Sequence, residues 1–238
     1  MTVSEAIVIG PRYRGPPHSG NGGYVAGLLG ARLGGSGDAS FRRPVPLGRE
    51  LQADWDMAEG TATLCDQGEL LVEVQKSAVA IDAPPPPSLA EATDASARYL
   101  GRRVRLPFAH CLGCGIERAE GDGLRIFAGP VGRDGLYAAP WTPHAAHASG
   151  DGEVRPEFVW TALDCSGGFA LMGEVMRFLV TAWLAVRIDA LPRAGETYIV
   201  AAWPVERGER KHKSGTAIFA TDGRVLAVGG ALWIEPRS

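Results

Sequence analysis

The sequence predicts an α+β fold built from two similar halves, each a curved antiparallel β-sheet that wraps one central helix. The 238 residues contain 32 glycines and 17 prolines. Because these residues end regular elements and favour turns, such a composition favours many short strands over a helical bundle. A set of landmarks also occurs twice in the same order, which is the signature of an internal repeat. Each copy reads as a helix, a strand, a second strand, a hairpin and a last strand.

The clearest landmark is a β-hairpin near the end of each half. Residues 66–81 (DQGELLVEVQKSAVAI) resemble residues 221–234 (TDGRVLAVGGALWI). Each has a glycine-containing turn before a long run of β-forming residues. We therefore expect Gly68 and Gly223 to adopt the positive φ angles that tight hairpin turns require.

Two further landmarks precede each hairpin. Residues 46–51 and 192–197 each lead into alternating residues that end in Trp55 or Trp203. Upstream of these, residues 22–33 and 156–171 read as helices rich in small residues. Glycine lowers the intrinsic helicity of the first segment, but small side chains suit a helix that lies in the concave face of a sheet.

The domain boundaries follow from composition. Residues 1–83 form the N-terminal repeat, residues 84–110 a linker or strap, and residues 111–238 the C-terminal repeat. Four consecutive prolines, residues 84–87, end the first half because they offer no amide donors to a sheet. Residues 124–127 and 135–141 are expected to form the opening hairpin of the second half.

Bulk properties exclude several classes of protein. The net charge is −3, whereas a general nucleic-acid binder is usually basic, so no nucleic-acid partner is expected. The longest apolar stretch, residues 178–186, is far short of the ~20 residues that span a bilayer. The N-terminus lacks the charged and apolar regions of a signal peptide, and four cysteines are too few for a disulfide scaffold. A cytoplasmic protein without a membrane partner is therefore the expectation.

Short motifs along nearly the whole chain resemble the hotdog superfamily, in particular the PaaI-like acyl-CoA thioesterases. HCLGCG (residues 110–115), followed by GDGLRIF (121–127), is similar to the opening of that group. WTALDCSGGF (160–169) is similar to its acid-bearing central helix, and HSGNGG (18–23) to the start of the helix in the other half. The resemblance implies a tandem, double hotdog fold with a thioester-binding site between the two repeats.

Asp164 is the candidate catalytic acid or base. It lies about two turns into the second helix among apolar and small residues, where burial raises a carboxyl pKa. An aspartate that caps a new turn at residues 166–168 is the alternative interpretation. Glu157 is a second acid, but its place in the first helical turn is explained by the helix dipole alone.

The start of the first helix supplies the complementary groups. Its backbone N–H groups are suited to binding a developing oxyanion, and Gly20, Gly22 and Gly23 allow close approach of a ligand. Asn21 either caps this helix or donates its amide. His18 is a candidate to orient water or bind the thioester oxygen, with a structural role as the alternative. Because Gly27 aligns with Asp164, the two halves are expected to share one site.

Other residues are candidates for substrate binding. Tyr24 and Trp160 are candidates to line an apolar acyl pocket, with plain core packing as the alternative, and Gly167 and Gly168 flank the acid. A basic cluster that includes Arg210, Lys211 and Lys213 suits the phosphates of coenzyme A; a solvated hairpin tip explains the same residues.

The cysteines do not predict a metal site. Cys111 and Cys114, with His144 and His147, nominally provide four zinc ligands, but the histidine pair is spaced too tightly for the usual finger pattern. A tight turn with packed thiols is the preferred interpretation, with Cys65 and Cys165 as core residues. No metal or cofactor is expected, and the resemblance implies none.

Three functions remain open. The first is hydrolysis of an acyl-CoA or acyl-carrier thioester, with Asp164 activating water or attacking the carbonyl. The second is a hotdog dehydratase or hydratase, which needs a close Asp–His pair such as Asp164 with His18. The third is a non-catalytic acyl-ligand-binding protein. A homodimer of the double hotdog is a further expectation that the sequence does not decide.

Overall fold

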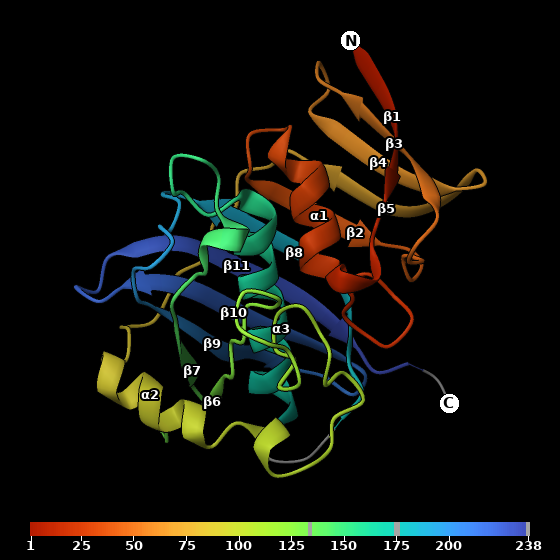
Figure 1. Ribbon diagram of the computed structural model, residues 1–238. Coiled ribbons are helices and arrows are strands. Elements are labelled where there is room, and N and C mark those ends of the chain that lie inside the picture. Colours follow the sequence, from red (N-terminus) through yellow and green to blue (C-terminus); the bar gives the residue numbers. More distant parts are fainter. Residues whose placement is uncertain (133–134, 174–176, 237–238) are drawn as a thin grey trace.

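The computed structural model describes residues 1–132, 135–173 and 177–236, and the fold is α+β. Helices are few, and strands carry most of the regular structure (Figure 1). The first part of the chain contains β1 (Thr2–Val8), η1 (Pro11–Tyr13), α1 (Gly22–Ala31), β2 (Gly37–Phe41), β3 (Glu50–Asp56), β4 (Thr61–Asp66) and β5 (Glu69–Gln75). The rest contains α2 (Leu89–Ala97), η2 (Leu100–Arg102), β6 (Gly129–Pro130), β7 (Tyr137–Trp141), η3 (Ala145–His147), α3 (Pro156–Met172), β8 (Val180–Ile188), β9 (Tyr198–Arg207), β10 (Lys211–Ala220) and β11 (Val225–Ile234).

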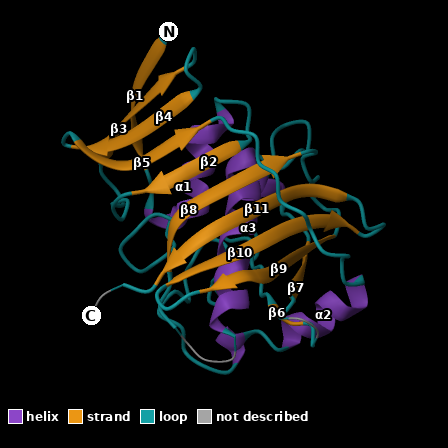
Figure 2. Cartoon of the chain, turned by 180° about the vertical axis from the view of Figure 1, so that it is seen from behind, coloured by secondary structure: helices purple, strands orange, loops and turns teal. Residues whose placement is uncertain are grey.

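The described strands form one antiparallel sheet rather than the two that the sequence predicts. Its eleven strands run in the order β1-β3-β4-β5-β2-β8-β11-β10-β9-β7-β6. The two halves join where β2 pairs with β8, with Asp38 opposite Ala185. Figure 2 shows this continuous sheet with α1 and α3 behind it. The prediction missed the junction because edge pairing between distant strands leaves no local pattern.

Each side of the junction has the same strand order. Reading inward from the outer strands, the first half runs β1-β3-β4-β5-β2 and the second runs β7-β9-β10-β11-β8, with the short β6 added at the edge. In both halves the long helix follows the first of these strands and precedes the innermost one. The predicted order of helix, strand, strand and hairpin is confirmed.

The predicted turns adopt the expected backbone conformations. Gly68 and Gly223 have φ angles of 86° and 91°, and each lies in the turn between two paired strands. The segments that lead into β3 and β9 also share one conformation, since Gly48 and Gly195 have φ angles of 74° and 83°. These are left-handed conformations that favour glycine.

The segment between the halves forms a strap, and the opening hairpin of the second half is shorter than predicted. Residues 84–87 form no strand, and α2 follows with a capping box between Ser88 and Glu91, as a strap against β6 and β7 (Figure 1). However, residues 124–127 are not a strand, and Arg125 has a positive φ of 56°. The opening hairpin is therefore only β6 paired with β7.

The small residues of α1 allow it to pack directly on α3. A Cβ atom at Gly23 would lie 2.6 Å from the carbonyl oxygen of Trp160, and one at Gly27 would lie 2.6 Å from the Cα of Glu157. Since Gly23 and Gly27 are one turn apart, they form a flat strip on one face of the helix. Glycine is required there because the neighbouring helix occupies the space of a side chain.

No helix in the described part of the chain combines the length and apolar character needed to cross a lipid bilayer.

The substitution Gly27→Ala tests the helix contact. Alanine favours a helix by about 1 kcal/mol, but overpacking against Glu157 and Trp160 costs about 1–3 kcal/mol, and the contact is with backbone that cannot move alone. We expect a net loss of up to about 2 kcal/mol in the free energy of urea unfolding. Gly150→Ala, where the added Cβ would meet nothing within 4 Å, is the control and should change it by less than about 0.5 kcal/mol. Equal effects of the two substitutions would contradict the tight contact.

Candidate functional site

Asp164 lies where the two long helices meet. Its side chain projects from α3 to the N-terminus of α1 and is 4% exposed. The backbone N–H of Gly23 donates to Oδ2 at 3.0 Å, and the hydroxyl of Thr181 on β8 donates to Oδ1 at 2.9 Å. The acid of one half therefore contacts the helix start of the other half. It caps no turn of its own helix, because α3 continues unbroken to Met172.

Burial raises the pKa of Asp164 to about 6, even though hydrogen bonds from Gly23 and Thr181 lower it. Negative charge on nearby Cys111 raises it further. A carboxyl group with this pKa is mostly ionised at pH 7 and still accepts a proton readily, which suits a general base. The raised pKa also means that protonated Asp164 contributes to the free energy of unfolding at low pH. This contribution is lost as the pH rises from 3.8, the ordinary pKa, to about 6, the pKa in the folded state.

The start of α1 offers a backbone donor beside this carboxylate. Asn21 is the N-cap, and its Oδ1 accepts from the N–H of Tyr24 at 2.9 Å. The N–H of Gly23 is engaged by Asp164, whereas that of Gly22 has no hydrogen-bond partner among the described residues. Gly22 is half-buried and lies close to Asp164 Oδ2 and the ring of Phe41. A hydrogen-bond acceptor placed beside Gly22 would therefore contact both its unpaired N–H and the carboxylate of Asp164.

His18 is not brought to Asp164. It is exposed in a turn before α1, and it makes no hydrogen bond or ion pair with any described residue. Both oxygens of Asp164 are instead held by Gly23 and Thr181. The close Asp–His pair that a dehydratase requires is therefore not formed between these two residues in the described structure.

Four predicted substrate-binding residues lie in the core. Trp160 is fully buried and donates its indole N–H to the carbonyl of Gly35 at 2.8 Å. Tyr24 is buried and stacks on Tyr13 with ring centroids 4.1 Å apart. Gly167 and Gly168 instead let α3 pack on the sheet, since added Cβ atoms would lie 2.4 Å from Ser214 Oγ and 3.1 Å from the ring of Trp233. All four residues therefore take part in packing between helices and sheet, and their contact with a ligand stays a prediction.

The basic cluster occupies the tip of the β9–β10 hairpin. Arg210 donates to the carbonyl of Glu235, and Lys213 forms an ion pair with Glu206 at 2.7 Å. Lys211 is exposed and has no ion-pair partner among the described residues. Arg207 donates to the carbonyls of Ala170 and Leu171, which places this tip at the C-terminal end of α3.

Three cysteines form a cluster that the sequence did not predict. The sulfur atoms of Cys111, Cys114 and Cys165 lie within 4.8 Å of one another, and the ring nitrogens of His144 and His147 are not part of this group. The four-ligand set considered from the sequence is therefore wrong. Cys165 was missed because its proximity depends on how the loop around Cys111 packs on α3.

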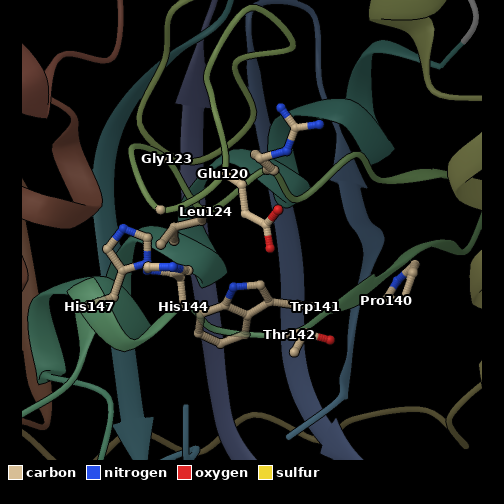
Figure 3. Close-up of a pocket in the computed structure, with 10 residues that line it drawn as sticks. Glu120, Gly123, Leu124, Pro140, Trp141, Thr142, His144 and His147 are labelled. Carbon is tan, nitrogen blue, oxygen red and sulfur yellow. The ribbon is translucent and has the colours of Figure 1, made fainter. Parts of the chain in front are cut away.

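A separate pocket of about 160 Å³ lies beside His147. Figure 3 shows His144, His147 and Trp141 around it, with Glu120 on the facing loop. His147 is buried, and neither ring nitrogen has a protein hydrogen-bond partner among the described residues. Burial, and then the positive charge of Arg12, lower its pKa to about 4. His147 is thus a neutral imidazole at pH 7.

Three solved structures have the same fold, and two of them are named as thioesterases. A protein of that name from Novosphingobium aromaticivorans is 17% identical, with a TM-score of 0.64 over 98% of this chain and 96% of that one. The tesB protein of Mycobacterium avium subs paratuberculosis is 12% identical, with a TM-score of 0.64 over 99% and 93% of the two chains. A protein named as a thioesterase II from Thermobifida fusca is 15% identical, with a TM-score of 0.59 over 98% and 92%.

No protein-family model and no curated protein sequence matches the chain. The structural similarity covers nearly its full length at low identity, so it defines the fold. The chain has a hotdog thioesterase-like fold.

Replacing His147 tests its unusual protonation. Because its folded pKa is lowered to about 4, the neutral form stabilises the fold above the ordinary pKa of 6.5, and that stability is lost as the pH falls. We expect the wild type to lose about 2 kcal/mol more unfolding free energy than His147→Phe between pH 7 and pH 5. Chemical denaturation at both pH values measures this difference. Parallel losses in the two proteins would show that His147 titrates normally.

Proposed function

We propose that the protein hydrolyses a thioester, in the class of acyl-CoA or acyl-carrier substrates, within a tandem double hotdog. The observation that carries the proposal is the contact of Asp164 with the N-terminus of α1. It combines a base of raised pKa with a free backbone donor, and these are the two groups that thioester hydrolysis needs. The fold shared with proteins named as thioesterases agrees with this chemistry.

The strand order supports the tandem arrangement. Both sides of the β2–β8 junction repeat one topology around one long helix. Because Asp164 comes from the second helix and Gly22 from the first, one site needs both halves. When the helix starts are aligned, Gly27 of the first half lies opposite Asp164. The space that a side chain at Gly27 would need is occupied by α3. The proposal therefore includes one site and no second, equivalent one.

In the proposed reaction the thioester oxygen accepts a hydrogen bond from the N–H of Gly22. The positive end of the α1 dipole stabilises the negative charge that develops on this oxygen. Asp164 takes a proton from a water molecule as that water attacks the carbonyl carbon. The tetrahedral adduct then collapses, the C–S bond breaks, and the thiolate leaves and accepts the proton from Asp164. Direct attack by Asp164 is the alternative route, but Gly23 and Thr181 hold both its oxygens, which favours the role of base.

The remaining predicted residues take supporting roles in this proposal. Asn21 fixes the start of α1 and hence the direction of the Gly22 N–H. Lys211 is free to attract phosphate at the hairpin tip. Leu171, which accepts a hydrogen bond from Arg207 near the hairpin tip, is seven residues after Asp164 in α3. This is about 10 Å along the helix, a distance that the pantetheine arm of coenzyme A can span.

Asp164→Asn tests the base. We expect the rate of thiol release from an acyl-CoA panel of short, long and aromatic chains to fall by ~10²–10⁴-fold. The free energy of unfolding should stay equal or rise, because the variant removes a buried charge. Glu157→Gln, on the same helix and also buried, is the matched control and should keep its activity. An unchanged rate of thiol release in Asp164→Asn would contradict the proposal.

The pH dependence gives a second check. Since the base must be ionised and its pKa is about 6, kcat/KM should rise tenfold per pH unit below that value and level off above it. Rates of thiol release between pH 4.5 and 8 measure the profile. A flat profile, or one that rises only above pH 8, is incompatible with Asp164 as the base.

Enoyl-CoA distinguishes the hydratase alternative. Loss of the double bond without thiol release would favour a hydratase, and binding without turnover would favour a ligand-binding protein.

A further inference from the structure

The three-cysteine cluster has the geometry of a metal site. Cys111 and Cys114 come from one tight loop and Cys165 from α3, and their sulfur atoms all lie within 4.8 Å of one another. The Cys111 and Cys165 sulfur atoms are 3.5 Å apart. In a tetrahedral zinc site with Zn–S bonds of about 2.3 Å, sulfur atoms lie roughly 3.8 Å apart. One ion at the centre therefore needs only small shifts of the side chains.

The surroundings of the cluster supply hydrogen-bond donors to two of its three sulfur atoms. The amide of Asn21 donates to Cys111 Sγ at 3.7 Å and to Cys165 Sγ at 3.6 Å. The backbone N–H groups of Gly113 and Cys114 also point at the Cys111 sulfur. Such N–H donors stabilise negative sulfur and orient the ligands around a metal ion. Cys111 and Cys114 are almost fully buried, so packing rather than solvent holds these sulfur atoms together.

The loop around the two cysteines is shaped to bring them together. A Cβ atom at Gly115 would lie 2.5 Å from the carbonyl oxygen of Cys111, and one at Gly113 would lie 2.8 Å from Cys165 Sγ. A larger residue at Gly113 would push the loop off α3, and one at Gly115 would clash with the backbone of the loop itself. The tight turn expected from the sequence is therefore also what places Cys165 beside the pair.

We infer that Cys111, Cys114 and Cys165 bind a single thiophilic cation of the Zn²⁺ or Cu⁺ class. Soft sulfur ligands select these ions over Mg²⁺ or Ca²⁺. Binding displaces the thiol protons, so the affinity falls as the pH is lowered. No other histidine, cysteine or carboxylate of the described residues belongs to the cluster. Zn²⁺ would therefore keep a water molecule as its fourth ligand, whereas Cu⁺ would be held by the three sulfur atoms alone.

The site adjoins the proposed catalytic residues without including them. Cys165 follows Asp164 on α3, and Asn21 precedes Gly22 at the start of α1. A bound ion would tie the loop around Cys111 to α3 and, through Asn21, to the helix start. It would also reduce the negative charge near Asp164, whose pKa is raised in part by Cys111.

Titration of the reduced, metal-free protein with Co²⁺ tests the inference, because Co²⁺ replaces Zn²⁺ and thiolate ligation gives intense charge-transfer absorption. We expect one ion per chain, bleaching on addition of Zn²⁺, and loss of the spectrum in Cys111→Ser and in Cys165→Ser. Cys65→Ser is the matched control, since this free cysteine lies on β4 away from the cluster, and its spectrum should equal that of the wild type. Cu⁺ with a chromogenic competitor forms the second arm and identifies the preferred ion.

Alkylation of the wild-type chain provides a readout that does not depend on how the variants fold. Zn²⁺ or Cu⁺ should slow the alkylation of the three cluster cysteines at least tenfold and leave Cys65 unchanged, as mapped by mass spectrometry. The inference is overturned if neither ion protects these cysteines, or if binding persists in Cys165→Ser. It is overturned equally if the cysteines join as a disulfide under mild oxidation and the reduced protein takes up no ion. Because none of these measurements uses thioester turnover, a failure here leaves the proposed hydrolysis standing, and the reverse is also true.

Discussion

The close contact between α1 and α3 is the constraint on which the rest of the structure depends. Gly23 and Gly27 leave no side chain on the shared face, so the backbone of one helix lies against that of the other. At any larger separation, the N–H of Gly23 would not reach the carboxylate of Asp164. The β2–β8 pairing holds the two halves in register around this contact.

This contact makes an otherwise costly buried carboxylate tolerable. Burial opposes the charge of Asp164, while the hydrogen bonds from Gly23 and Thr181 favour it. The balance leaves a pKa of about 6, close to the pH at which a base works best. The same arrangement leaves the Gly22 N–H without a partner among the described residues, and this N–H is the donor that the proposed reaction uses.

The two halves keep one topology but have diverged in chemistry. The second half carries the acid and the three clustered cysteines, whereas the first half supplies the helix start and Asn21, which donates to two of those sulfur atoms. Neither half has the complete set. The proposed site therefore draws on both halves of the chain.

The sequence by itself determined the local elements and their order. Both long helices, the turns at Gly68 and Gly223 and the repeated strand order were predicted from local composition, from the repeated landmarks and from residues whose conformations are restricted. Asp164 was identified because it is an acid among apolar residues and because residues 160–169 resemble the acid-bearing helix of the PaaI-like thioesterases. Only the tertiary structure decided that the sheet is continuous, that Trp160 is core and that Cys165 joins Cys111. Each of these depends on contacts between residues far apart in sequence, whose proximity no local pattern records.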